Sequence, residues 1–191
     1  MNRITALWRT SPGALLLALG TIGLAAALTI GSGANFTSTT ANPSNIFTAG
    51  TLTHSNSKAG AAILTGSNMR PGDTASGTVD IKNTGTLSGV FTLAKTVTAD
   101  TTAPANPFAT KLTVVITDQG DPACVSSCPA PVAVYSGTVS GMGTVALGTY
   151  AAGATHRYSF VVTFPDGGAN GADNVYQAAS TTVTYTWTAT S

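Results

Sequence analysis

The last eleven residues, Thr-Thr-Val-Thr-Tyr-Thr-Trp-Thr-Ala-Thr-Ser, constrain the fold more than any other stretch of this chain. Threonine occupies every second position from 182 to 190. Because successive side chains of a strand point to opposite faces, such alternation places one set in a core and the other toward water. We therefore predict a C-terminal strand whose inward residues close the core, namely Val183, Tyr185 and Trp187.

Shorter stretches with alternating or β-branched residues recur along the chain, separated by glycine, proline and asparagine turns about every ten residues. No stretch after residue 34 has helical periodicity. This pattern predicts an all-β chain folded as a jelly-roll-type β-sandwich. The predicted strands before the last one are residues 46–53, 61–65, 74–82, 87–97, 111–117, 132–135, 143–147 and 156–164.

The first 34 residues have the pattern of a signal peptide. Arg3 and Arg9 precede an apolar run over residues 14–30, and small residues follow up to Ala34. We predict cleavage after Ala34, and an uncleaved anchor is the alternative because the run approaches the length that spans a bilayer. The expected product is secreted, to the extracellular matrix or the cell surface, and meets the membrane only through its signal segment. It would comprise a mobile N-terminal segment, residues 35–45, and a β-sandwich domain, residues 46–191.

The low charge of the chain excludes several kinds of partner. Charged residues make up 8% of the sequence, and the net charge is +1. No basic stripe is present, so we expect no nucleic-acid partner. A hydrophobic fraction of 43% nevertheless provides enough apolar surface for a core.

Cys124 and Cys128 are separated by three residues within a loop that has proline on both sides. In an oxidising compartment the simplest interpretation is a local disulfide, which stabilises little because its loop is short. A metal-binding pair would need further ligands, and a redox-active pair more often has the Cys-x-x-Cys spacing.

The sequence offers little for catalysis. Its seven acidic residues are all aspartates, and its two histidines, His54 and His156, are not arranged in a metalloprotease motif. We predict no catalytic residues, no metal and no cofactor. A weak calcium contact in the loop over residues 166–173 stays open, although the spacing of its oxygen-bearing side chains is not that of an EF-hand.

Four short motifs, in this order, resemble those of the TasA/camelysin family. They are Phe-Thr-Ala-Gly-Thr-Leu at 47–52, Met-Arg-Pro-Gly-Asp at 69–73, Asn-Thr-Gly at 83–85 and Asn-Val-Tyr-Gln-Ala at 174–178. Family members typically have leucine in place of Met69 and glycine in place of Ala178. Each motif is weak alone, but the four together are fairly specific.

The resemblance implies a jelly-roll subunit of biofilm-matrix fibres, in which the N-terminal segment of one subunit enters the sheet of its neighbour as a donor strand. The expected partner is therefore the chain itself, in a head-to-tail homopolymer, with accessory matrix or cell-surface proteins as further candidates. Main-chain hydrogen bonds would give affinity, and alternate side chains would give register. The matching donor residues are Asn35, Phe36, Thr37, Ser38, Thr39 and Thr40.

Two other functions are weighed against the fibre subunit. One is a monomeric surface adhesin or carbohydrate-binding module that uses an aromatic platform, with Tyr135, Tyr150 or Trp187 as candidates. The other is a metalloprotease, because camelysin-like members have been described as metallopeptidases. The missing glutamate argues against the second.

Overall fold

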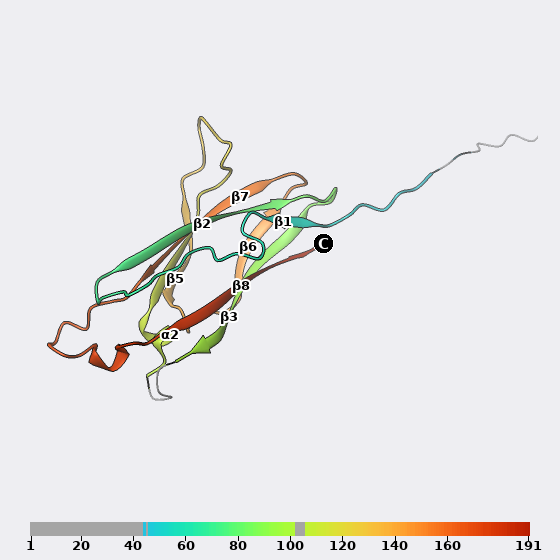
Figure 1. Cartoon of the computed structure of the whole chain (residues 1–191). Helices are drawn as coiled ribbons and strands as arrows, with labels where there is room; N and C mark the ends of the chain where they lie inside the picture. Colours follow the sequence, from blue (N-terminus) through green and yellow to red (C-terminus); the bar gives the residue numbers. More distant parts are fainter. Residues whose placement is uncertain (1–43, 45, 102–105) are drawn as a thin grey trace, which may run out of the picture. The chain divides into compact units, whose positions relative to one another are not determined.

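Eight strands form the framework of the part of the chain that the computed structural model describes, residues 44, 46–101 and 106–191 (Figure 1). The chain divides into two units, Met1–Phe47 and Thr48–Ser191, and all of these strands belong to the second. The predicted signal segment and the predicted donor residues lie outside the described residues. The strands are β1 (His54–Asn56), β2 (Thr74–Asn83), β3 (Gly89–Asp100), β4 (Thr113–Asp118), β5 (Val132–Thr138), β6 (Val145–Tyr150), β7 (Thr155–Thr163) and β8 (Thr181–Thr190).

The strands form two antiparallel sheets, which confirms the predicted all-β sandwich. The five-stranded sheet has the order β1-β2-β7-β4-β5, and the three-stranded sheet has the order β6-β3-β8. β8 pairs with β3 from Thr190 opposite Val90 to Thr181 opposite Asp100, with one register shift between Val97 and Ala99. β3 therefore lies between the two edge strands of its sheet, and β7 is the middle strand of the other sheet.

This topology is that of a jelly roll with one strand displaced. A complete jelly roll of eight strands has sheets in the orders β1-β8-β3-β6 and β2-β7-β4-β5. Here β2-β7-β4-β5 is intact, but β1 pairs with the outer edge of β2 instead of with β8. Within the described ranges, the three-stranded sheet consequently ends at β8.

The core lies between the two sheets and is built by their inward-facing residues. On β7, alternate residues are buried, as the period of two predicted. Tyr158 and Phe160 are fully buried there, opposite Trp187 of β8, whose exposed fraction is 7%. Burying a side chain of this size stabilises the fold by roughly 1.5–3 kcal/mol.

One buried polar side chain, that of Asn83, is found among the described residues of the core. Its Nδ2 donates to the backbone oxygens of Leu87 and Tyr150, at 2.9 and 3.1 Å. Its Oδ1 accepts a hydrogen bond from the backbone N–H of Gly85. Asn83 thus closes the turn between β2 and β3 and joins it to the end of β6.

Two predicted strands are wrong. Residues 46–53 form no strand, because the carbonyl oxygens of Thr51 and Thr53 accept hydrogen bonds from the turn at residues 84–87 and not from a sheet. The first strand begins only at His54, where β2 offers Ile81–Asn83 as partners. Residues 61–65 also form no strand, and their adjacent apolar residues pack on the core without a ladder.

Two short helical segments were not predicted. The helix α2 (Phe108–Lys111) has four residues, and the 3-10 helix η1 (Asn174–Tyr176) has three. Neither is long enough to produce a periodic sequence signal. Asp100 holds the start of α2, because its carboxylate accepts hydrogen bonds from the backbone N–H groups of Phe108 and Ala109.

Candidate functional site

A groove of about 780 Å³ is lined mainly by the β1–β2 loop, the start of β8 and the segment that precedes β8, and it is the feature of this fold best suited to bind a partner. Its floor contains the apolar side chains of Phe108, Val162 and Phe164. Its walls include Val183 and Tyr185 of β8. Clefts of about 300–1,000 Å³ are large enough to enclose several side chains.

The three residues predicted to close the core divide along β8. Trp187 is buried, whereas Val183 and Tyr185 are half-buried and face the groove. The threonines of β8 between positions 182 and 190 are exposed on the outer face, as the alternation predicted. Val183 and Tyr185 keep part of their surface open because no described strand lies beside them on the far side of β8.

The loop between β1 and β2 forms one side of the groove. Ile63, Leu64 and Met69 pack against the core cluster and line the groove. The backbone of Ile63 passes so close to Gly77 of β2 that a side chain at position 77 would collide with it. Yet residues 62–69 of this loop make no hydrogen bond to either sheet within the described part of the chain. They cover the core but do not extend a sheet.

The polypeptide enters the sandwich at the opposite end of β8 from the groove. The carbonyl of Thr51 accepts hydrogen bonds from the backbone N–H groups of Thr86 and Leu87, in the turn that precedes β3. Beside this turn, Gly89 lies next to Thr190, at the end of β8. The groove is lined by Thr181–Tyr185, at the start of β8. A ten-residue strand spans about 30 Å, so chain entry and groove are far apart.

His54 and His156 lie in the five-stranded sheet, on strands that flank β2. Two aromatic rings separate them, because His54 contacts Phe91 edge-on, Phe91 stacks on Tyr150, and Tyr150 stacks on His156. The Nδ1 of His156 is already bonded to Asp118 at 2.8 Å. Two histidines held apart in this way do not share one metal ion.

No group of three or more His, Cys, Asp or Glu side chains in the described ranges is arranged to hold a metal ion. In the loop over residues 166–173, the two aspartates already have protein partners. Asp173 pairs with Lys111 at 2.7 Å and accepts a hydrogen bond from the N–H of Gly167, and these contacts lower its pKa. Asp166 accepts a hydrogen bond from Gly168. Each of the two aspartates considered for calcium thus already has a protein donor.

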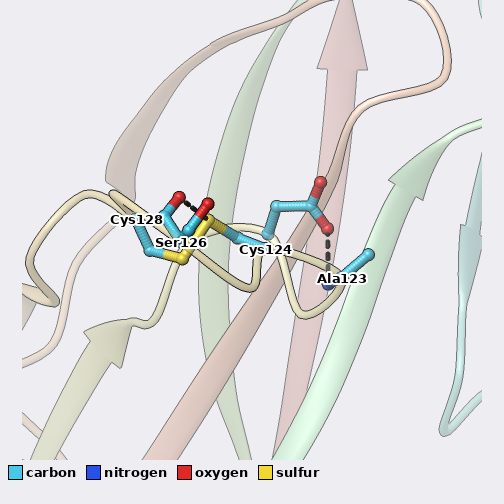
Figure 2. Close-up of a disulfide and its surroundings, with 5 residues drawn as sticks. Ala123, Cys124, Ser126 and Cys128 are labelled. Carbon is cyan, nitrogen blue, oxygen red and sulfur yellow. Dashed lines mark hydrogen bonds between the residues drawn. A yellow bond between two sulfur atoms is a disulfide. The ribbon is translucent and has the colours of Figure 1, made fainter.

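Cys124 and Cys128 form a disulfide in the loop between β4 and β5, with a Cα–Cα distance of 5.8 Å (Figure 2). Asp121 shapes the same loop by accepting a hydrogen bond from the N–H of Ala123. Between the two cysteines, the side chain of Val125 is almost fully exposed. The pair is a local cross-link at the tip of a hairpin.

The aromatic residues considered for a carbohydrate platform do not form one. Tyr150 and Trp187 are buried, and Tyr135 is half-buried, with its hydroxyl donating to the carbonyl of Thr138. Tyr150 instead forms a buried hydroxyl pair with Tyr158. Burial raises the pKa of Tyr150 to about 12 and raises that of Tyr158 further. This pair joins strands β6 and β7, which no local sequence pattern brings together.

No helix in the described ranges is both long and apolar enough to cross a membrane. A family model described as camelysin metallo-endopeptidase matches residues 15–116, which is more than half of the chain. No curated protein matches the sequence.

Proposed function

This chain belongs to the camelysin family, and we propose that it is a secreted structural subunit that polymerises head to tail into extracellular fibres by donor-strand complementation. In this proposal, residues 35–40 of one copy complete the sandwich of the next. The product lies in the extracellular matrix or at the cell surface, and accessory matrix or surface proteins are candidate further partners. We assign it no catalytic role.

The observation that supports this function is that, among the described residues, no strand lies beside β8 at the edge of the three-stranded sheet. A complete jelly roll has a strand beside β8, whereas β1 of this chain pairs with β2. An open sheet edge next to an apolar groove is a hazard for a soluble protein unless a strand covers it. Addition of a strand from another copy satisfies the edge, and a head-to-tail contact that does not close produces a filament.

Deletion of residues 35–40 tests the proposal. The purified wild-type product should form filaments visible by negative-stain electron microscopy, and the deletion variant should remain as folded subunits with the same circular dichroism spectrum. The double variant Cys124→Ser/Cys128→Ser is the control, because its changes lie in the β4–β5 loop, and it should still form filaments. Filaments of normal appearance after the deletion would contradict strand donation.

The family description favours one other function, a metal-dependent endopeptidase. The residues described here do not fit the metal that this activity needs, because two aromatic rings separate the histidines and the chain has no glutamate. Zinc content and casein cleavage, each measured with and without a chelator, distinguish the two functions. Stoichiometric zinc together with chelator-sensitive cleavage would establish the peptidase and remove our assignment.

A further inference from the structure

We propose that Asn170 is a site of spontaneous covalent modification, at which the protein converts its own side-chain amide into a carboxylate without an enzyme. The reaction couples two adjacent residues, Asn170 and Gly171, in the loop between β7 and β8. The sequence contains no other Asn-Gly pair. Conversion at this pair does not require polymerisation of the chain.

The reacting atoms are the backbone nitrogen of Gly171 and the side-chain Cγ of Asn170. The nitrogen attacks Cγ, ammonia leaves with the proton that the nitrogen loses, and a cyclic imide closes the backbone onto the side chain. Water then opens the imide at either carbonyl, which gives aspartate or isoaspartate. The conversion consumes water and releases ammonia, and no oxidant, metal or cofactor takes part. Because both groups belong to one chain, the attack is intramolecular and needs no binding step.

Three features of the structure leave this pair reactive. Asn170 and Gly171 are both exposed, in the turn that precedes η1. The backbone N–H of Gly171 donates to no acceptor among the described residues, so the attack does not require a hydrogen bond to break. Gly171 has a φ of 80°, and because it has no side chain, it leaves room for the Asn170 amide to approach its nitrogen.

Two other asparagines are protected at the same backbone position. The N–H that follows Asn56 donates to the carbonyl of Asp80 at 3.0 Å, and the N–H that follows Asn83 donates to that of Thr53 at 2.9 Å. The side-chain oxygens of both asparagines also accept backbone hydrogen bonds. Imide formation at either residue must therefore first break hydrogen bonds, which Asn170 does not have to do.

An Asp-Gly pair in the same loop provides an internal comparison. Asp166 and Gly167 can close the same imide, with water as the leaving group in place of ammonia. Here the N–H of Gly167 donates to Oδ2 of Asp173 at 2.7 Å, and Lys111 holds this carboxylate in place. The attacking nitrogen of this pair is therefore bonded. We expect reaction at Asn170 and protection at Asp166.

Conversion changes the rim of the groove. Asp173 and Tyr176 line the groove and follow position 170 closely in the chain. Aspartate at position 170 adds a negative charge beside this rim. Isoaspartate also lengthens the backbone by a methylene group, inside the turn in which the N–H of Ala172 donates to the carbonyl of Ala169 at 3.0 Å. The rim of the groove therefore changes as the protein ages.

Ageing of the purified, folded protein in neutral buffer tests the site. Replacement of the amide NH2 by OH changes the mass of the peptide that contains residue 170, and electron-transfer fragmentation distinguishes isoaspartate from aspartate. We expect conversion at Asn170 to be at least about tenfold faster than at Asn56 or Asn83, which corresponds to a barrier lower by about 1.4 kcal/mol. Asn170→Gln is the matched control, because it keeps an amide whose ring closure is slower, and its acidic charge variant should not accumulate on ion exchange. Conversion at Asn170 that is no faster than at the other two asparagines would overturn the proposal.

Incubation in urea isolates the effect of the fold. Unfolding frees the N–H groups that follow Asn56 and Asn83, so conversion at these two residues should accelerate more than conversion at Asn170 does. An equal acceleration at all three residues would show that backbone hydrogen bonds do not decide the site, and it would contradict the structural basis of the proposal.

One further variant tests the protection of the neighbouring pair. Asp173→Ala removes the acceptor of the Gly167 N–H, and isoaspartate should then appear at Asp166 faster than in the wild type. Circular dichroism establishes that the variant is folded. An unchanged rate at Asp166 in the folded variant, or a wild-type rate there equal to that at Asn170, would likewise contradict control by the backbone N–H.

Discussion

At the scale of single residues, the fold depends on polar groups placed where the two sheets meet. Asn83 bonds to the backbone at three points, and Tyr150 and Tyr158 bond to each other inside the core. In the five-stranded sheet, the ion pair of Arg157 with Asp80 lowers the pKa of that aspartate, chiefly through its hydrogen bonds. These contacts fix how the ends of strands join, which apolar packing alone does not determine.

Replacing Asn83 with alanine should lower the free energy of unfolding by about 2–3 kcal/mol. The substitution leaves the N–H of Gly85 and the carbonyls of Leu87 and Tyr150 without their partner, and buried unsatisfied groups are costly. Urea titration of the unassembled subunit measures the change. Asn56→Ala is the matched control, because its side chain caps one exposed turn, and should cost less than about 1 kcal/mol. Equal effects of the two substitutions would contradict this role.

Alkaline solution should destabilise the fold through three tyrosines, of which Tyr150 and Tyr158 are buried and Tyr185 is half-buried. Burial raises the pKa of Tyr150 and Tyr185 to about 12, and that of Tyr158 further, whereas an unfolded tyrosine ionises near pH 10. Because the folded-state pKa is raised, the stabilisation is complete below about pH 10 and is lost as the pH rises above it. We expect a loss of about 1 kcal/mol per tyrosine by pH 11, measured as a fall in melting temperature. Tyr185→Phe should reduce this pH dependence by about a third, and an unchanged slope would contradict the assignment.

At the scale of elements, the alternation of β8 could be predicted because its outward threonines are exposed and its inward residues are at least half-buried along the whole strand. The position of β8 at the edge of its sheet could not be predicted, because a local sequence pattern does not indicate which strands pair with each other. The apolar pair Ile63 and Leu64 resembles a short strand in sequence but packs as an irregular loop. The groove depends on this loop and on β1 pairing with β2, so the sequence predicted the sandwich but not its binding surface.

Removing the disulfide should change stability only slightly. Cys124 and Cys128 are four positions apart in the β4–β5 loop, and closing so short a loop constrains the unfolded chain little. We expect Cys124→Ser/Cys128→Ser to cost about 2 kcal/mol or less in urea titrations. The variant should unfold in one transition. Loss of cooperative folding would show that the loop supports the core.

At the scale of the whole molecule, an apolar groove and a weakly charged surface are combined in one chain. Charged residues make up 8% of the sequence, so electrostatic steering adds little to association between copies. The proposed contact depends instead on main-chain pairing and on one aromatic side chain. Phe36 is the only large apolar residue of the donor segment, and its burial should dominate the affinity.

Phe36→Ala should raise the protein concentration needed for filament formation by about tenfold to a hundredfold. Burying an aromatic ring is worth roughly 1.5–3 kcal/mol, and about 1.4 kcal/mol corresponds to a factor of ten. Sedimentation of filaments over a concentration series measures the threshold. Val125→Ala removes an exposed apolar side chain from the disulfide loop and should leave the threshold unchanged. A similar rise in the threshold concentration for both variants would indicate non-specific hydrophobic association, and it would contradict a specific role for Phe36.

Residues 51–52 and the groove lie at opposite ends of β8, and this separation determines how filament growth could be stopped. Every polymer built by strand donation has two unlike ends. One end has a vacant groove, and the other has an unpaired donor segment. A short synthetic peptide with the sequence of residues 35–40 would block the groove at the first end, and it would also block the groove of free subunits, which the second end needs in order to grow. Elongation would then slow at both ends, and the mean length of the polymers would fall as the peptide concentration rises.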